Sequence, residues 1–164
     1  MRGGVTAAVT LAFLLVTVPP AGAGSSRPSG FASSMTVTAS PRAAKAHAVR
    51  LRLTLRYQMQ CGYAGAGPLV VTFPRRLKLP QQLAAGAVLL GGKAVAATVE
   101  GRQVIVRVAP NKGKLCDLMG IGSLRLVFTP LAKLSNPARA GSYRFQASHA
   151  KRTFEASLTI EPAA

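Results

Sequence analysis

The sequence predicts an all-β protein, a β-sandwich of about seven to nine antiparallel strands with one disulfide. Short segments in which apolar and polar residues alternate recur along the chain, and Gly and Pro residues separate them at fairly even spacing. Helix signals are poor. Because a period of two places alternate side chains on opposite faces of a strand, each segment can bury one face against a second sheet.

The clearest strand is Val49–Cys61. Its odd-numbered residues are apolar, aromatic or cysteine, and its even-numbered residues are polar or charged. This alternation predicts a half-buried strand whose leucines face the core. Arg50, Arg52 and Arg56 then lie on its outer face.

Further segments complete the predicted sandwich. In chain order they are residues 35–39, 69–73, 88–90, 93–99, 103–108, 123–128, 143–148 and 154–160. Gly91-Gly92 and Glu100-Gly101 are typical hairpin turns, so we expect the segment between them to pair with the strands on both sides. Pro74 ends a strand because it has no N–H to donate.

Residues 1–23 have the features of a signal peptide. A basic start precedes the apolar run Val5–Val18, and small residues mark a predicted cleavage site after Ala23. The run is shorter than the ~20 residues needed to span a membrane, so we expect a secreted or extracytoplasmic chain after Sec-type cleavage, with no membrane span. Residues 24–34 are a predicted flexible leader and residues 35–164 the predicted sandwich domain.

The two cysteines, Cys61 and Cys116, favour a structural disulfide, since disulfides persist in exported proteins. A bridge that closes so long a loop would stabilise the fold by about 4 kcal/mol in the chain-entropy model. A free thiol or a metal site is the alternative. The cysteine spacing is not CxxC, and His47 and His149 have no ligand-like spacing to either cysteine, so we expect no metal and no cofactor.

Several short motifs occur in a definite order along the chain. They are GPLVVTFP at residues 67–74, Leu79-Pro80, VLLGG at residues 88–92 and NPARAGSYRF at residues 136–145. This order resembles that of Ig-like β-sandwich modules in secreted and surface proteins of Gram-positive and related bacteria, over the region from about Met35 to Ile160. The resemblance implies a single Ig-like sandwich with an extracellular architectural or binding role, and it carries no catalytic residues.

Tyr143 lies near the start of a predicted strand, just after Gly141. A tyrosine at such a position in a sandwich often packs its ring inward and donates its hydroxyl to a nearby backbone carbonyl. We favour this structural use over ligand binding.

The formal net charge of +17 exceeds what solubility requires. The predicted anion-binding residues are the arginines at outward-facing strand positions: Arg50, Arg52, Arg56, Arg107, Arg125 and Arg144. If the strands that contain Val49, Leu124 and Tyr143 share one sheet, a basic face follows, which would attract anionic cell-wall polymer or polysaccharide. The alternative is a solvated face that reflects compositional bias. A specific nucleic-acid partner is not expected, since familiar reader motifs are absent and aromatic residues are few.

The predicted disulfide would bring together loops 62–67 and 111–122, which form a second candidate site for a protein partner. Its residues are Tyr63, Lys112, Lys114, Asp117, Leu118, Met119 and Ile121. The apolar members either form a docking patch or cap the end of the sandwich.

Enzyme activity is not expected. A Ser-His-Asp set could use His149 and Asp117, but no Gly-x-Ser-x-Gly turn positions a nucleophilic serine. The few carboxylates are not arranged as a catalytic pair. A small secreted hydrolase is therefore the least favoured alternative.

Overall fold

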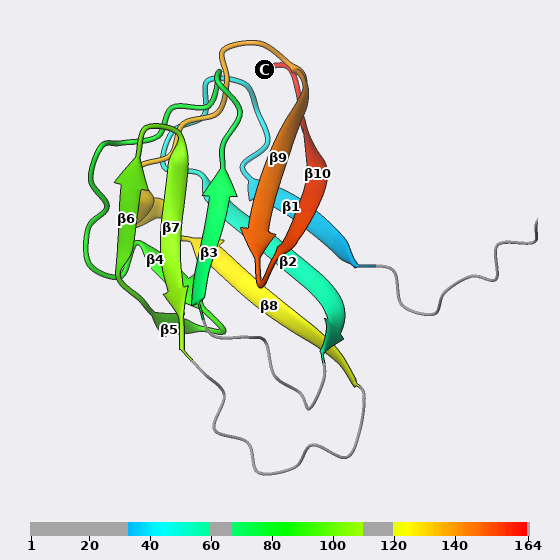
Figure 1. Ribbon diagram of the computed structural model, residues 1–164. Helices are drawn as coiled ribbons and strands as arrows, with labels where there is room; N and C mark the ends of the chain where they lie inside the picture. Colours follow the sequence, from blue (N-terminus) through cyan, green and yellow to red (C-terminus); the bar gives the residue numbers. More distant parts are fainter. Residues whose placement is uncertain (1–32, 60–66, 110–119, 164) are drawn as a thin grey trace, which may run out of the picture.

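The computed structural model describes residues 33–59, 67–109 and 120–163, and for 57–59 and 120–122 it describes the backbone only. These residues form two five-stranded antiparallel sheets that pack face to face as a β-sandwich (Figure 1). The predicted fold class is confirmed. The predicted signal peptide and most of the predicted leader lie outside the described residues.

Each sheet combines strands that are distant in sequence. Sheet I has the order β1 (Ser34–Ser40), β2 (Arg50–Met59), β8 (Gly120–Phe128), β4 (Val88–Leu90) and β5 (Lys93–Ala94). Sheet II has the order β10 (Arg152–Ile160), β9 (Gly141–His149), β3 (Gly67–Thr72), β7 (Gln103–Val108) and β6 (Ala97–Glu100). A short 3-10 helix, η2 (Pro130–Ala132), follows β8.

Every predicted segment contains a strand, but the segment at residues 93–99 is divided. Its first part, β5, pairs with β4 across Gly91-Gly92, and its second part, β6, pairs with β7 in the other sheet. The chain therefore changes sheets at residues 95–96. Alternation reports which face of a segment is buried and not which strand it pairs with, so the sequence pattern does not reveal this change.

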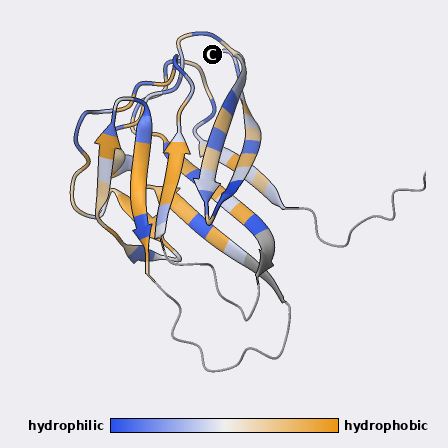
Figure 2. Ribbon diagram, in the orientation of Figure 1, coloured by the Kyte–Doolittle hydropathy of each residue, from blue (hydrophilic) through white to orange (hydrophobic). Residues whose placement is uncertain are grey.

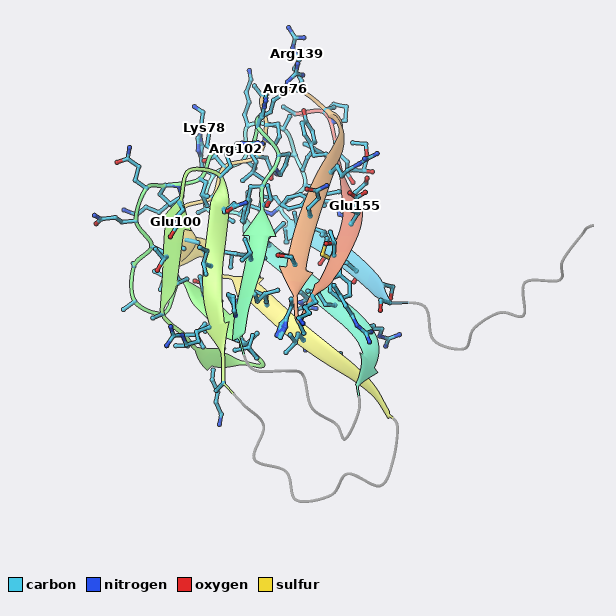
Figure 3. All side chains as sticks on the ribbon, viewed as in Figure 1. Arg76, Lys78, Glu100, Arg102, Arg139 and Glu155 are labelled. Carbon is cyan, nitrogen blue, oxygen red and sulfur yellow. The ribbon has the colours of Figure 1, made fainter. Side chains whose placement is uncertain are left out.

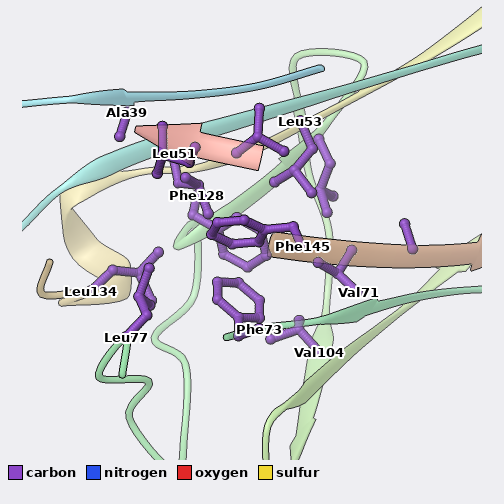
Figure 4. Close-up of a cluster of buried hydrophobic side chains, with 14 of the residues drawn as sticks. Ala39, Leu51, Leu53, Val71, Phe73, Leu77, Val104, Phe128, Leu134 and Phe145 are labelled. Atoms are coloured by element: carbon purple, nitrogen blue, oxygen red, sulfur yellow. The ribbon is translucent and has the colours of Figure 1, made fainter. Parts of the chain in front are cut away.

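The core lies between the inner faces of the two sheets. Figure 2 shows the corresponding alternation of hydrophobic and hydrophilic bands along β9 and β10. Phe73 contacts Phe128 and Phe145 edge to face, with ring centroids 5.3 and 5.5 Å apart (Figure 4). Such pairs contribute about 0.5–1.5 kcal/mol each beyond the burial of their area. Phe73 follows β3 and Phe145 belongs to β9, both in sheet II, whereas Phe128 belongs to β8 in sheet I. The contact between Phe73 and Phe128 therefore joins the two sheets.

The two ends of the sandwich are built differently. At one end, Met59 pairs with Gly120 and Gly67 pairs with Val108. The described ends of β2 and β7 and the described starts of β3 and β8 therefore lie at this same end (Figure 1). The opposite end includes the turn between β6 and β7 and three described loops, at residues 41–49, 73–87 and 129–140, which hydrogen bonds join to one another (Figure 1).

Candidate functional site

The outer face of sheet I carries four arginines. The three leucines of β2 are fully buried, so the alternation of the strand turns Arg50, Arg52 and Arg56 to solvent. Arg125 of β8 is also exposed and has the same outward orientation. These positions agree with the outward parity predicted from the sequence.

The strand register brings these arginines close together. Arg125 lies opposite Thr54, which stands between Arg52 and Arg56 on β2. Same-face neighbours on one strand are about 7 Å apart, and diagonal neighbours on adjacent strands about 7–8 Å apart. Both separations fall within the Debye length of about 8 Å in physiological salt. The positive potentials of the arginines therefore add.

A row of hydroxyl side chains borders the arginines on β1. Ser34, Thr36, Thr38 and Ser40 are exposed and lie opposite Arg56, Thr54, Arg52 and Arg50, respectively. Their hydroxyl groups can donate hydrogen bonds to anionic oxygens that the arginines attract. We call these four hydroxyl residues, Thr54 and the four arginines the basic face.

No described carboxylate lies on the basic face. Glu155 lies on sheet II, where its carboxylate is 3.7 Å from Arg144. Glu161 follows β10 and is 4.0 Å from Arg42. Glu100 ends β6, also in sheet II. Among the described residues, the four arginines of the basic face have no ion-pair partner, which leaves their charge available to an external anion.

Two of the predicted anion-binding residues do not join this face. Arg107 lies on β7 opposite Pro68, and Arg144 lies on β9 opposite Ser157. Both strands belong to sheet II. The Tyr143 strand therefore does not share a sheet with the Val49 strand, so this condition for one basic face is not met. Alternation in the sequence shows which side chains of a strand point outward, but it does not show which sheet contains the strand.

The outer face of sheet II has a different character. One row of neighbouring residues crosses all five strands: Glu155, Gln146, Thr72, Gln103 and Glu100. Within it, the Gln146 side-chain amide donates to the Glu155 carboxylate at 2.7 Å, and the Gln103 amide donates to the Thr72 hydroxyl at 3.4 Å. The sandwich therefore has one basic face and one mixed polar face.

Tyr143 has the structural use that its position predicts. Its ring is buried, and its hydroxyl donates a hydrogen bond of 2.6 Å to the backbone carbonyl of Arg139. This bond closes the loop that leads into β9. Tyr143 is thus part of the scaffold.

Most residues of the predicted loop site lie outside the described residues: Tyr63, Lys112, Lys114, Asp117, Leu118 and Met119, together with both cysteines. Ile121 is within β8, where its backbone lies opposite Gln58. The disulfide therefore stays a prediction. In sequence, Cys61 follows Met59 by two residues and Cys116 precedes Gly120 by four.

His149, considered above for catalysis, is 3 % exposed at the end of β9. Burial lowers the pKa of its imidazole below the ordinary value of 6.5.

Within the described chain, no group of three or more His, Cys, Asp or Glu side chains could hold a metal ion. No helix in this part of the molecule is long and apolar enough to cross a membrane.

Comparison with known proteins supports the fold. No protein family and no curated protein matches the chain. Among solved structures, the chain is similar to BslA, described as a bacterial hydrophobin, with 22% identity and a TM-score of 0.52 over 80% of this chain and 99% of BslA. A variant of BcpA, the major pilin subunit of Bacillus cereus, matches with 12% identity and a TM-score of 0.39 over 79% of this chain and 40% of that protein. At this identity, the likeness to BslA shows a shared sandwich architecture.

The sequence analysis missed a second group of cations, in the loops opposite the Met59–Gly120 end. These cations are Lys45, Arg76, Lys78 and Arg139, and they line one cavity there together with His47. They come from three separate loops and share no periodicity, so only the fold brings them together. Arg139 lies in the motif at residues 136–145 that carries the resemblance to Ig-like modules, but that motif gives no sign of the other residues of the cavity.

Proposed function

We propose that this chain is a secreted, non-enzymatic β-sandwich protein of the cell envelope that binds an anionic cell-wall polymer or polysaccharide through its basic face. The observation that carries the proposal is the convergence of four exposed arginines on one sheet face without a described carboxylate. The fold similarity to a bacterial hydrophobin fits an extracellular structural role.

The geometry of the basic face suits a linear polyanion. Its arginines follow β2 at intervals of about 7 Å or multiples of it, so a polymer with repeated charges can meet several of them in succession. Each guanidinium can form two parallel hydrogen bonds to a phosphate or carboxylate group. Binding of this kind releases counterions, so affinity should fall steeply as salt rises.

Single-stranded nucleic acid is a poorer fit to the same surface. Proteins that bind it usually stack bases on aromatic side chains. The basic face consists of arginine, serine and threonine, and none of its residues is aromatic. The basic face therefore offers a nucleic acid charge attraction alone, which any linear polyanion receives equally.

The alternative is an interaction site on loops 62–67 and 111–122, facing either a protein partner or an interface. Two observations favour it: the sequence places Leu118, Met119 and Ile121 close together, and BslA is described as a hydrophobin. A surface-active protein needs a large exposed apolar patch. Among the described residues, Leu131 is the only large hydrophobic side chain that is exposed, and the alternative places such a patch on these loops.

The test is sedimentation with purified anionic cell-wall material at several salt concentrations. We expect the double variant Arg52→Gln/Arg125→Gln to bind at least about tenfold more weakly, because it removes two of the four clustered charges. The matched control is Arg107→Gln/Arg144→Gln, which removes the same charge from sheet II.

Equal losses in the two variants would show that net charge alone causes binding, and no loss in either would show that the basic face is not used. If the loop alternative is correct, Met119→Ser/Ile121→Ser will instead abolish capture of a partner or activity at an interface. The Arg52→Gln/Arg125→Gln variant will then behave like the wild-type protein.

A further inference from the structure

A cavity of about 520 Å³ lies among the three loops opposite the Met59–Gly120 end. Its lining comprises Lys45, His47, Arg76, Lys78, Ser135, Asn136, Ala138 and Arg139. Figure 3 shows Arg76, Lys78 and Arg139 projecting at this end, while Glu155 lies on strand β10. The cavity is separate from the basic face, which lies on the side of the sandwich.

Backbone hydrogen bonds hold the three loops in fixed positions. Lys78 and Ser135 exchange two backbone bonds of 3.2 and 3.3 Å, which join loop 73–87 to loop 129–140. The Lys45 N–H donates to the Pro137 carbonyl at 3.0 Å, and the Asn136 N–H donates to the Ala46 carbonyl at 2.9 Å. These bonds set the spacing of the cavity walls before any ligand binds.

The base of the cavity is polar. Ser135 and Asn136 are 9 % and 4 % exposed, and the Ser135 hydroxyl lies 2.9 Å from Nδ1 of His47. The Asn136 amide donates to the carbonyls of Pro41 and Ala43 at 3.0 and 2.9 Å. Hydrogen bonds therefore fix the Ser135 hydroxyl and the Asn136 side-chain N–H groups, while Oδ1 of Asn136 is buried and has no hydrogen-bond partner among the described residues.

The walls carry only positive charge. Lys45, Arg76, Lys78 and Arg139 line the cavity, and no acidic residue is among the residues that line it. The like charges that line the cavity repel each other, and a bound anion would reduce that repulsion. Lys45 also has a left-handed backbone (φ 62°), which glycine would adopt at lower cost but without supplying a charge.

We infer that this cavity is a binding site for a phosphate group, either free or attached to a polyol. A phosphate dianion presents several acceptor oxygens, which match two guanidinium groups, two ammonium groups and a serine hydroxyl better than the two oxygens of a carboxylate. The cavity has room for on the order of fifteen water molecules, so an organic group can accompany the phosphate.

The experiment measures binding by isothermal titration calorimetry and by chemical-shift changes. Inorganic phosphate, glycerol 3-phosphate and glycerol are titrated separately at constant ionic strength. We expect saturable binding of the phosphate-bearing probes and none of glycerol. Tighter binding of glycerol 3-phosphate would assign the site to a polyol phosphate, and tighter binding of inorganic phosphate would assign it to the free anion.

The variant Arg76→Gln/Lys78→Gln should weaken phosphate binding by at least tenfold. Both side chains are exposed and the backbone bonds of Lys78 are retained, so the fold should persist; Arg139→Gln provides an independent variant in the third loop. The matched control is Arg107→Gln/Arg144→Gln on sheet II, outside both proposed sites, which should bind phosphate like the wild type. Equal weakening in the cavity and control variants, or binding that never saturates, would overturn the inference.

The phosphate-binding proposal and the polymer-binding proposal can fail separately, and the two pairs of variants distinguish them. If the basic face binds polymer but the cavity does not bind phosphate, only the Arg52→Gln/Arg125→Gln variant will lose cell-wall binding. If the cavity binds phosphate but the basic face is unused, only the Arg76→Gln/Lys78→Gln variant will show a defect.

Discussion

At the level of single residues, Asn136 and Tyr143 organise the loop end of the sandwich. The two carbonyls that accept from the Asn136 amide belong to the connection between β1 and β2, and the carbonyl that accepts from Tyr143 belongs to the loop before β9. Each side chain thus satisfies backbone groups that no strand ladder reaches. The tyrosine contact could be predicted from sequence because it is local, whereas the asparagine contacts span more than ninety residues.

His149 should make stability depend on pH. Burial lowers its pKa in the folded protein, so the unfolded chain gains a proton on this residue at a higher pH than the folded chain does. The unfolded state then binds more protons once the pH falls below about 6.5, and the free energy of unfolding falls with it. Urea unfolding between about pH 8 and pH 5 measures this decrease.

The two histidines provide the control for this measurement. His149→Gln should reduce the pH dependence in that range, whatever its effect on absolute stability. His47→Gln is the same substitution at the exposed second histidine and provides the comparison for the effect of the substitution itself. An unchanged pH slope in His149→Gln would contradict the role of His149.

At the level of elements, β2 determines both the core and the basic face. Its residues alternate between sites with no exposure and sites open to solvent, and its register with β8 places Arg125 between two of its arginines. The alternation is a property of the sequence and predicts the burial correctly. The register and the assignment of strands to sheets arise from tertiary pairing, which is why the sheet II positions of Arg107 and Arg144 could not be predicted.

The inner and outer residues of β2 should respond differently to truncation. Leu53→Ala removes a fully buried side chain and should lower the free energy of unfolding by about 2–5 kcal/mol, because it leaves a cavity between the sheets. Thr54→Ala, its neighbour on the outer face, should cost less than about 1 kcal/mol. Denaturant unfolding measures both, and similar costs would contradict the assignment of the two faces.

At the level of the whole molecule, the two ends of the sandwich have different chemistry. At one end, basic side chains from three loops line a cavity that backbone hydrogen bonds hold in place. At the other end, Met59 pairs with Gly120 and Gly67 pairs with Val108. The cavity could not be predicted because its residues come from three loops. The disulfide, predicted from export and the presence of two cysteines, stays a prediction because both cysteines lie outside the described residues.

The disulfide prediction can be tested directly. Under denaturing conditions, a thiol assay should detect no free thiol before reduction and both cysteines afterwards. Cys61→Ser/Cys116→Ser should lower the free energy of unfolding by up to about 4 kcal/mol, because the unfolded chain regains the entropy of a long open loop. Free thiols in the exported, unreduced protein would show that the bridge does not form.

The contrast between the two sheet faces also sets an orientation. The basic face extends along the strands, so a protein bound through it lies on its side, with its strand axes parallel to the surface that it covers. The row from Glu155 to Glu100 then faces outward, and both ends of the sandwich point sideways toward neighbouring molecules. A layer of such molecules would replace an anionic surface with a mixed polar one and would leave the phosphate cavity open at its side.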